Sequence, residues 1–164
     1  MPFTCASCGQ YHDELPLCFL APAPAQVAVV AEAERARRVL LSSDQCIIDE
    51  EYFFILGNLD LPIVDREEMF RWSVWSSLSR KNFERASDLW ETAGRESEPP
   101  YFGWLSTAIP GYERTVGLKV VVHTKPVGTR PAIEVIEQDH LLYRDFVDGI
   151  SWARACELSH AALS

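Results

Sequence analysis

The sequence predicts an α+β fold: a mainly antiparallel sheet with helices packed on one side and an N-terminal zinc-knuckle-like segment. Three observations predict it. The chain has 164 residues, enough for one hydrophobic core and too few for two full-sized domains. Its strand-like and helix-like segments follow the order β-β-β-α-β-β-β-α-α, without the regular alternation of a parallel sheet. Two cysteines near the start have the spacing of a metal knuckle.

The composition is that of a folded, acidic protein. Apolar residues make up 48% of the chain and charged residues 24%, which excludes a largely disordered chain. The formal net charge of −9 disfavours binding to nucleic acid, because the overall field repels polyanions. The sequence contains no apolar run long enough for a membrane span and does not begin with the pattern of a secretion signal. We therefore expect no membrane partner and a cytoplasmic location.

One domain, residues 1–164, is expected, in three parts. Residues 1–19 form the metal-knuckle segment, residues 20–26 a connector rich in proline and alanine, and residues 27–164 the α+β body. Alternating prolines hold the connector extended. The good helix formers from 26 to 38 predict a short charged helix at the start of the body.

The first segment contains half of a tetrahedral metal site. The Cys-x-x-Cys spacing brings two thiolates to one ion, and the following Gly9 permits a tight turn. A closed site of four ligands would hold structural Zn²⁺ and fasten the terminus. The predicted ligands are Cys5, Cys8, His12 and Cys46. Other candidates for the remaining ligand positions are Cys18, Cys156 and His160. Reduced thiols without metal are the alternative, and a redox pair has less support.

The middle of the chain is rich in strand patterns. Residues 52–56 are apolar and end at Gly57-Asn58, which predicts a turn or bulge before a second strand over 59–64. Residues 69–78 alternate, with Phe70, Trp72, Val74 and Leu78 on one face. Three later strands complete the predicted order, over 101–107, 118–124 and 131–136.

Three helices are predicted from capping residues and helical spacing. Ser79 is an N-cap for a helix that runs to Ala93 and is closed by Gly94. Asp139 caps a short helix from His140 to Val147. A last helix follows the N-cap Ser151.

Hydrogen-bond donors are concentrated in the loop between the last two strands. His123, Lys125 and Arg130, with the backbone freedom of Gly128, suit a carboxylate or phosphate. The alternative is a rigid hairpin whose cations pair with neighbouring acids such as Glu134. The first of these two interpretations predicts an anion site in this loop.

Aromatic residues gather in the preceding segment. Tyr101 and Trp104 flank Gly103, and such side chains bury large areas at recognition surfaces at little entropic cost. They are therefore candidate ligand-binding residues, with a place in the core as the alternative. Exposure of Trp75 and Trp104 would favour a binding surface.

Five stretches of the chain resemble an uncharacterised bacterial family known only as a domain of unknown function. They are CASCGQYHDELP at 5–16, SSDQCIIDEEYFFILGNLDLPI at 42–63, VWSSLSRKNFERASDLW at 74–90, PYFGWLSTAIPGY at 100–112 and VHTKPVGTRPAIEV at 122–135. The resemblance implies no activity. It implies that Cys5, Cys8, His12 and Cys46 stand at recurrent motif positions.

Two functions compete at this point. The first is a binding module stabilised by structural zinc, for a protein partner or a small anionic ligand. The second is a small hydrolase or transferase in which His123 or His140 is the general base and Lys125 or Arg130 holds developing negative charge. Convergence of these side chains in one pocket would favour the enzyme, and their separation would exclude it.

Overall fold

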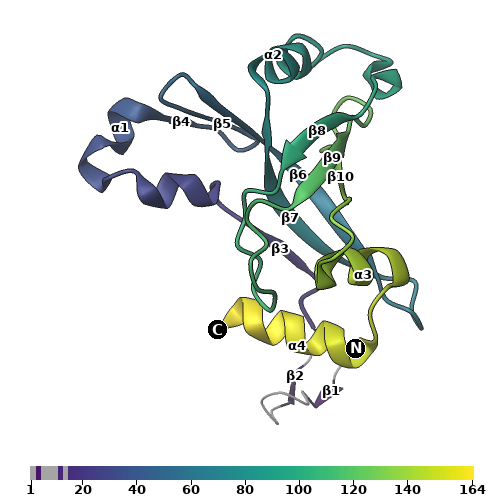
Figure 1. Ribbon diagram of the computed structural model, residues 1–164. Coiled ribbons are helices and arrows are strands. Elements are labelled where there is room, and N and C mark those ends of the chain that lie inside the picture. The colour runs from purple at the N-terminus through teal and green to yellow at the C-terminus, as the bar shows by residue number, and fades with distance from the viewer. Residues whose placement is uncertain (1–2, 5–10, 13–14) are drawn as a thin grey trace.

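The structure, a computed structural model, describes residues 3–4, 11–12 and 15–164, with side chains from residue 15 onward. An eight-stranded sheet forms its centre (Figure 1). The strands are β3 (Cys18–Leu20), β4 (Val39–Leu41), β5 (Gln45–Ile48), β6 (Tyr52–Pro62), β7 (Met69–Leu78), β8 (Tyr101–Trp104), β9 (Lys119–His123) and β10 (Ala132–Val135). Two short strands, β1 (Phe3–Thr4) and β2 (Tyr11–His12), pair with each other.

The sheet is mixed, so the prediction of a mainly antiparallel sheet is wrong. β3 runs parallel to β7, with Phe19 opposite Trp72, and β10 runs parallel to β6, with Ala132 opposite Asn58. The remaining strand pairs are antiparallel. Both parallel pairs join strands that are distant in the chain. Alternation along one strand shows which side chains share a face, but not which strand lies beside it or in which direction.

β6 is one continuous strand of 11 residues whose register with β7 is unbroken through Gly57 and Asn58, so the predicted turn or bulge at these residues is wrong. β6 pairs with β7 along nearly its whole length, from Phe53 opposite Leu78 to Pro62 opposite Met69. Gly57 has a packing role there: a Cβ built on it would lie 2.6 Å from Cδ1 of Ile133 on β10. Glycine permits this close approach of β10, which explains why it stands in the middle of a strand.

Each face of the sheet carries its own apolar core. The alternation predicted for 69–78 is observed, because Phe70, Trp72, Val74 and Leu78 all belong to the larger core. Trp75 points to the other face, where it is 1% exposed and its indole nitrogen donates to the carbonyl of Ala21. The connector is thereby fastened to the second core. That core consists of Val30, Cys46, Ile48, Phe54, Leu56 and Trp75.

Three helices contribute to the larger core: α2 (Arg80–Asp88), α3 (Leu141–Asp148) and α4 (Trp152–Leu163). Figure 1 shows α2 at one end of the sheet and α3 and α4 at the other. The predicted caps Ser79 and Ser151 are confirmed, since each hydroxyl accepts a hydrogen bond from the backbone NH three residues on. Within the described ranges, none of the helices has the length and apolar character that crossing a bilayer requires.

Two predicted helices differ in extent from those observed. The helix after Ser79 ends at Asp88, because the backbone of 89–98 tightens into turns such as the bond from Thr92 NH to the Leu89 carbonyl. The segment 26–38 is broken into 3₁₀ helices (Ala25–Val29 and Glu32–Glu34) and α1 (Arg35–Arg38). Its interruption at Val30 is extended and places that side chain, 4% exposed, in the second core.

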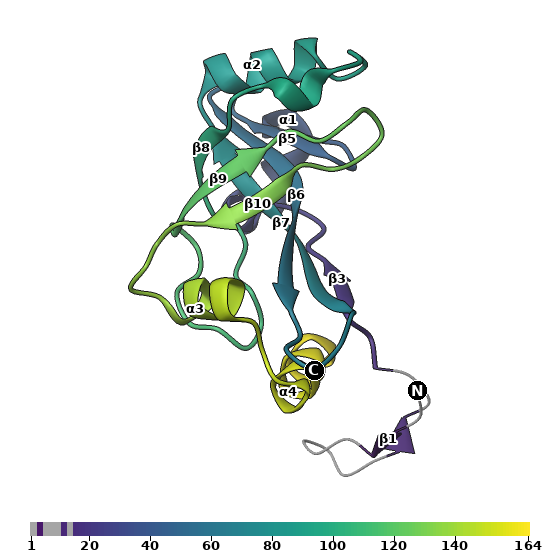
Figure 2. The same cartoon turned by 90° about the vertical axis from the view of Figure 1, so that its right-hand side faces the viewer.

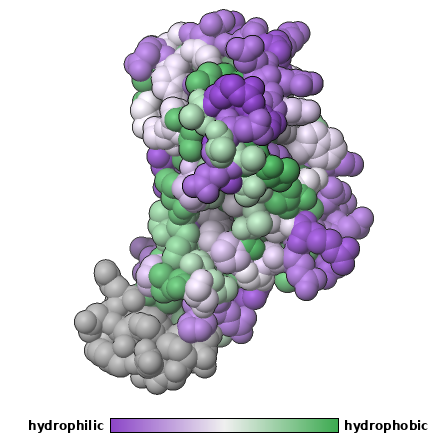
Figure 3. Space-filling view, turned by 90° about the vertical axis from the view of Figure 1, so that its left-hand side faces the viewer, coloured by the Kyte–Doolittle hydropathy of each residue, from purple (hydrophilic) through white to green (hydrophobic). Residues whose placement is uncertain are grey.

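The sheet curls, so that the segment after β8 lies against β7. Ser76 and Leu105 form an antiparallel bridge, and the Ser106 NH donates to the Trp75 carbonyl at 2.7 Å. Figure 2 shows β8, β9 and β10 crossing in front of β6 and β7. Small apolar patches lie among hydrophilic residues on the face shown in Figure 3. The curl brings the end of β9 near the residues that follow α2, and this meeting forms the candidate site.

Candidate functional site

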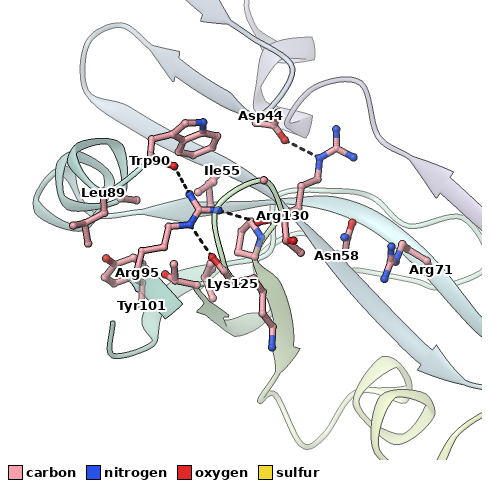
Figure 4. A pocket seen from close by; sticks show the side chains of 16 residues that line it. Asp44, Ile55, Asn58, Arg71, Leu89, Trp90, Arg95, Tyr101, Lys125 and Arg130 are labelled. Atoms are coloured by element: carbon pink, nitrogen blue, oxygen red, sulfur yellow. Dashed lines mark hydrogen bonds and ion pairs between the residues drawn. The ribbon is translucent and has the colours of Figure 1, made fainter. Parts of the chain in front are cut away.

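A cavity of about 450 Å³ opens between the loop that joins β9 to β10 and the residues that follow α2 (Figure 4). Its size lies within the range of small-molecule sites. The loop residues 124–125 and 128–131 form one wall. The end of α2, with Leu89 and Trp90, forms another, and β6 contributes Ile55 and Asn58. The cavity therefore draws on segments that are distant in the chain.

Cationic side chains outnumber carboxylates in the wall of the cavity. The lining cations are Arg71, Arg95, Lys125 and Arg130, and the lining carboxylate is Asp44. This balance is the opposite of the whole chain, whose formal net charge is −9. Concave surfaces lined by one sign of charge attract ligands of the other sign. The cavity is thus electrostatically suited to an anion.

Arg95 shapes the loop and is largely occupied by it. Its Nε donates to the carbonyl of Lys125 at 2.7 Å, and its Nη2 donates to those of Pro126 and Thr129 at 3.1 and 3.0 Å. Its Nη1 donates to the Trp90 carbonyl at 2.9 Å. One guanidinium thus fastens the loop to the segment after α2. Because most of its donors are taken, Arg95 preorganises the wall and offers little to a ligand.

Arg130 is held by a single contact. Its Nε donates to Oδ1 of Asp44 at 2.7 Å, and the Arg130 side chain is 37% exposed. Within the part of the chain that the structure describes, its two terminal nitrogens have no hydrogen-bond partner. The carboxylate fixes the direction of the side chain and leaves the outer edge of the guanidinium available for an oxoanion.

Tyr101 closes the cavity from β8. Its hydroxyl donates to Oε1 of Glu98 at 2.8 Å, and the same oxygen accepts from Arg85 Nε at 2.7 Å. Burial, followed by the bond to Glu98, raises the pKa of Tyr101 to about 12. The phenol therefore stays neutral at physiological pH and serves the wall as a ring with a satisfied hydroxyl.

The structure brings together three of the predicted ligand-binding residues: Tyr101, Lys125 and Arg130 all line the cavity. His123 does not line it, and its Nε2 lies 2.8 Å from Oε1 of Glu134 on the neighbouring strand. Trp104 is 47% exposed and packs edge-on against Phe102, beside a separate surface hollow. Neither His123 nor Trp104 thus faces a ligand in this cavity.

His140 caps a helix, a role that was predicted for Asp139. Its Nδ1 accepts from the Leu142 NH at 3.0 Å, and its Nε2 lies 2.6 Å from the carbonyl oxygen of Glu113. A carbonyl only accepts, so Nε2 carries the proton, and both ring nitrogens have structural partners. His140 does not line the cavity. The described residues therefore do not assemble the predicted pairing of a general base with Lys125 or Arg130.

The predicted zinc ligands are only partly described. Cys5 and Cys8 lie outside the described residues, and His12 is described only as a backbone position in β2. Cys46 lies in the second core, where it is fully buried, and burial raises the pKa of its thiol to about 11. Cys18 on β3 is exposed. Among the residues that the structure describes, no group of three His, Cys, Asp or Glu side chains is placed to hold a metal ion. The zinc site stays a prediction.

Sequence reasoning missed several residues of the cavity: Asn58, Arg71, Trp90 and Arg95. Arg71 lies on the face of β7 opposite to that of Phe70 and Trp72. The signal that would have added it is the complementary charge of Asp60, which lies directly opposite in the β6–β7 register. Arg95 had no such signal, because its partners are backbone carbonyls.

The fold and the cavity together define a mixed α/β protein with a cation-lined site of small-molecule size. The chain belongs to the family described as an uncharacterized protein conserved in bacteria (DUF2199), which matches residues 4–150. This match confirms the prediction of an uncharacterised bacterial family of unknown function. No curated protein and no solved structure matches the chain.

Proposed function

We propose that this protein is a binding module for a small anionic ligand, which it holds in the cavity without breaking a bond. The observation that carries the proposal is the reversal of charge: an acidic chain lines one concave site with four cations. Arg130 supports it further, because its guanidinium is oriented by Asp44 and keeps terminal donors available.

A small ligand has more support than a protein partner. The cavity is concave and of about 450 Å³, and its loop wall is preorganised by Arg95. Preorganised concave sites suit small molecules, whereas partner proteins use larger and flatter surfaces. The enzymatic alternative loses support because His123 and His140 lie outside the cavity and are bonded elsewhere.

A ligand that binds the folded protein raises its thermal stability in a saturable way. We expect inorganic phosphate and citrate to raise the melting temperature beyond what sodium chloride gives at the same ionic strength. Arg130→Met should abolish this rise. The matched control is Arg144→Met, which removes the same charge from an exposed position of α3 outside the cavity and should leave the rise intact. Equal effects of phosphate, citrate and chloride on the wild-type protein would refute the proposal.

We also propose that Cys5, Cys8 and His12 bind structural Zn²⁺, as their spacing predicts. Burial of Cys46 in the second core disfavours its thiolate form and so counts against it as the fourth ligand. Cys18 is the alternative, since it is exposed and lies near the end of the same segment, residues 1–19.

The zinc content of purified protein tests this proposal. We expect about one zinc per wild-type chain and close to none in Cys5→Ser. Cys18→Ser and Cys46→Ser form a matched pair: loss of zinc in one variant and not the other identifies the fourth ligand. A wild-type protein without zinc, purified without chelators, would end the proposal.

A further inference from the structure

The cavity lies at a split in the sheet. β5 and β10 share one edge of β6: the Leu56 NH donates to the Asp44 carbonyl at the start of β5, and the Asn58 NH donates to the Pro131 carbonyl at the start of β10. β5 runs antiparallel to β6 and β10 runs parallel to it, so the two strands diverge from this point. The gap lets the cavity contact residues from both faces of β6.

One end of the cavity is polar and is formed by side chains on the face of the sheet that carries the second core. Asn58 lies opposite Ser73, and Asp60 lies opposite Arg71, so all four share one face. Asp60 accepts from Arg71 Nε at 2.8 Å and Nη2 at 3.0 Å. This pairing fixes the orientation of the Arg71 guanidinium and leaves its Nη1 without a hydrogen-bond partner among the described residues.

Asn58 completes the polar end. Its Oδ1 accepts from the Ser73 hydroxyl at 2.8 Å, which fixes the orientation of the amide. Its Nδ2 has no hydrogen-bond partner in the described ranges. Figure 4 shows Asn58 between Arg130 and Arg71. Arg71, Asn58 and Arg130 therefore each keep an unused donor in the same cavity, and each is oriented by another side chain of the protein: Asp60, Ser73 and Asp44 respectively.

The other end of the cavity is apolar. Leu89 and Trp90, just beyond α2, lie there with Ile55 from the larger core, and Figure 4 shows them away from Arg71. Arg95 lies over the Trp90 ring, 5.6 Å from its centroid, and helps to hold it in place. Lys125 points away from Arg130 in the same view. The cations that face the split are thus Arg71 and Arg130.

We infer that the ligand is an amphiphilic oxoanion, a carboxylate or phosphate joined to an apolar body. Its anionic group binds between Arg71 and Arg130, where it also accepts from Asn58 Nδ2. Its apolar body lies against Leu89 and Trp90. This inference rests on the proposed function and adds the kind of ligand, its orientation and two binding residues, Asn58 and Arg71.

The test compares inorganic phosphate, phenyl phosphate and benzoate, with dissociation constants measured by NMR titration of ¹⁵N-labelled full-length protein. At least one of the two phenyl compounds should bind about tenfold more tightly than inorganic phosphate, because the ring buries apolar area. The two phenyl compounds distinguish a phosphate from a carboxylate preference. The indole NH signal of Trp90, assigned with Trp90→Phe, should shift with the phenyl compounds and not with inorganic phosphate.

Two variants that each remove one positive charge, and a third that adds a negative charge, test the orientation of the bound ligand. Arg71→Met should weaken the binding of all bound probes about tenfold, because it removes a charge-assisted hydrogen bond. Lys125→Met should change each dissociation constant by less than a factor of about three, as expected for a charge that does not touch the ligand. Asn58→Asp should weaken binding at least as strongly as Arg71→Met, because it places a like charge beside the anion.

The outcomes separate the two proposals. If no probe binds, the proposed function fails. If inorganic phosphate binds as tightly as both phenyl compounds, the anion site stands and the apolar body is refuted. If Lys125→Met abolishes binding while Arg71→Met leaves it unchanged, the orientation is refuted.

Discussion

The carboxylate of Glu98 makes stability depend on pH in one direction. It accepts from Arg85 and from the Tyr101 hydroxyl, and these bonds, Arg85 first, hold its pKa below the usual value of 4.5. The unfolded chain therefore binds this proton more tightly than the folded protein does. The contribution of Glu98 to stability is present above pH 4.5 and is lost as pH falls through its lowered pKa.

Glu98→Gln should therefore be less stable than the wild-type protein at pH 7, and the difference should shrink as pH falls below about 4.5. Urea unfolding between pH 3 and pH 7 measures it. Glu96→Gln, an exposed change two residues away, is the control and should show no such trend. A difference that stays constant across this range would show that Glu98 is not stabilised as a carboxylate.

The candidate-site residues that the sequence predicted are those with a local signal: Lys125 and Arg130 in one donor-rich loop, and Tyr101 in a cluster of aromatic residues. Lys125 and Arg130 stand in one loop, and the cavity does include both. Arg71 belongs to the same cavity through the pairing of β6 with β7, and the interpretation of Gly57-Asn58 as a turn hid that pairing. With β6 taken as one strand, Asp60 would have indicated its partner Arg71 from complementary charge alone.

At the scale of single elements, β8 approaches β7 more closely than ordinary side chains permit. A Cβ on Gly103 would lie 2.2 Å from the Ser76 hydroxyl oxygen and 2.3 Å from the Ser77 carbonyl oxygen. Gly103→Ala should therefore force the strands apart and lower the free energy of unfolding by about 1–3 kcal/mol. Urea unfolding at neutral pH measures the loss.

A second variant distinguishes this clash from a general effect of the substitution. Ser76→Ala combined with Gly103→Ala removes the hydroxyl and leaves the Ser77 carbonyl, so it should recover only part of the lost stability. Wild-type stability in Gly103→Ala alone would mean that the two strands are not in contact at this point.

Elements with strong local signals were predicted well. The strand over 69–78 is recognisable from its alternation of apolar and polar residues. The caps Ser79 and Ser151 are recognisable because each bonds to a backbone NH only three residues away, so the signal is local. The segment 26–38 was predicted less well. Its composition favours a helix, but Val30 is needed in the second core, and this tertiary contact overrides local propensity.

At the scale of the whole molecule, the order of the strands was beyond the reach of sequence patterns. The neighbours of β10 are β6 and β9, and those of β7 are β3 and β6, so the arrangement joins distant segments. The cavity inherits this difficulty because it forms where β5 and β10 diverge along β6. Local periodicity predicts strands and their faces, whereas the crevices between strands depend on their order.

β6 and β7 supply side chains to both apolar cores: Phe53 and Phe54 point to opposite faces, as do Val74 and Trp75. Neither core can unfold without removing packing contacts from the β6–β7 pair. The two cores therefore belong to a single cooperative unit, and amide protons on the two strands should exchange with solvent only when the whole molecule opens.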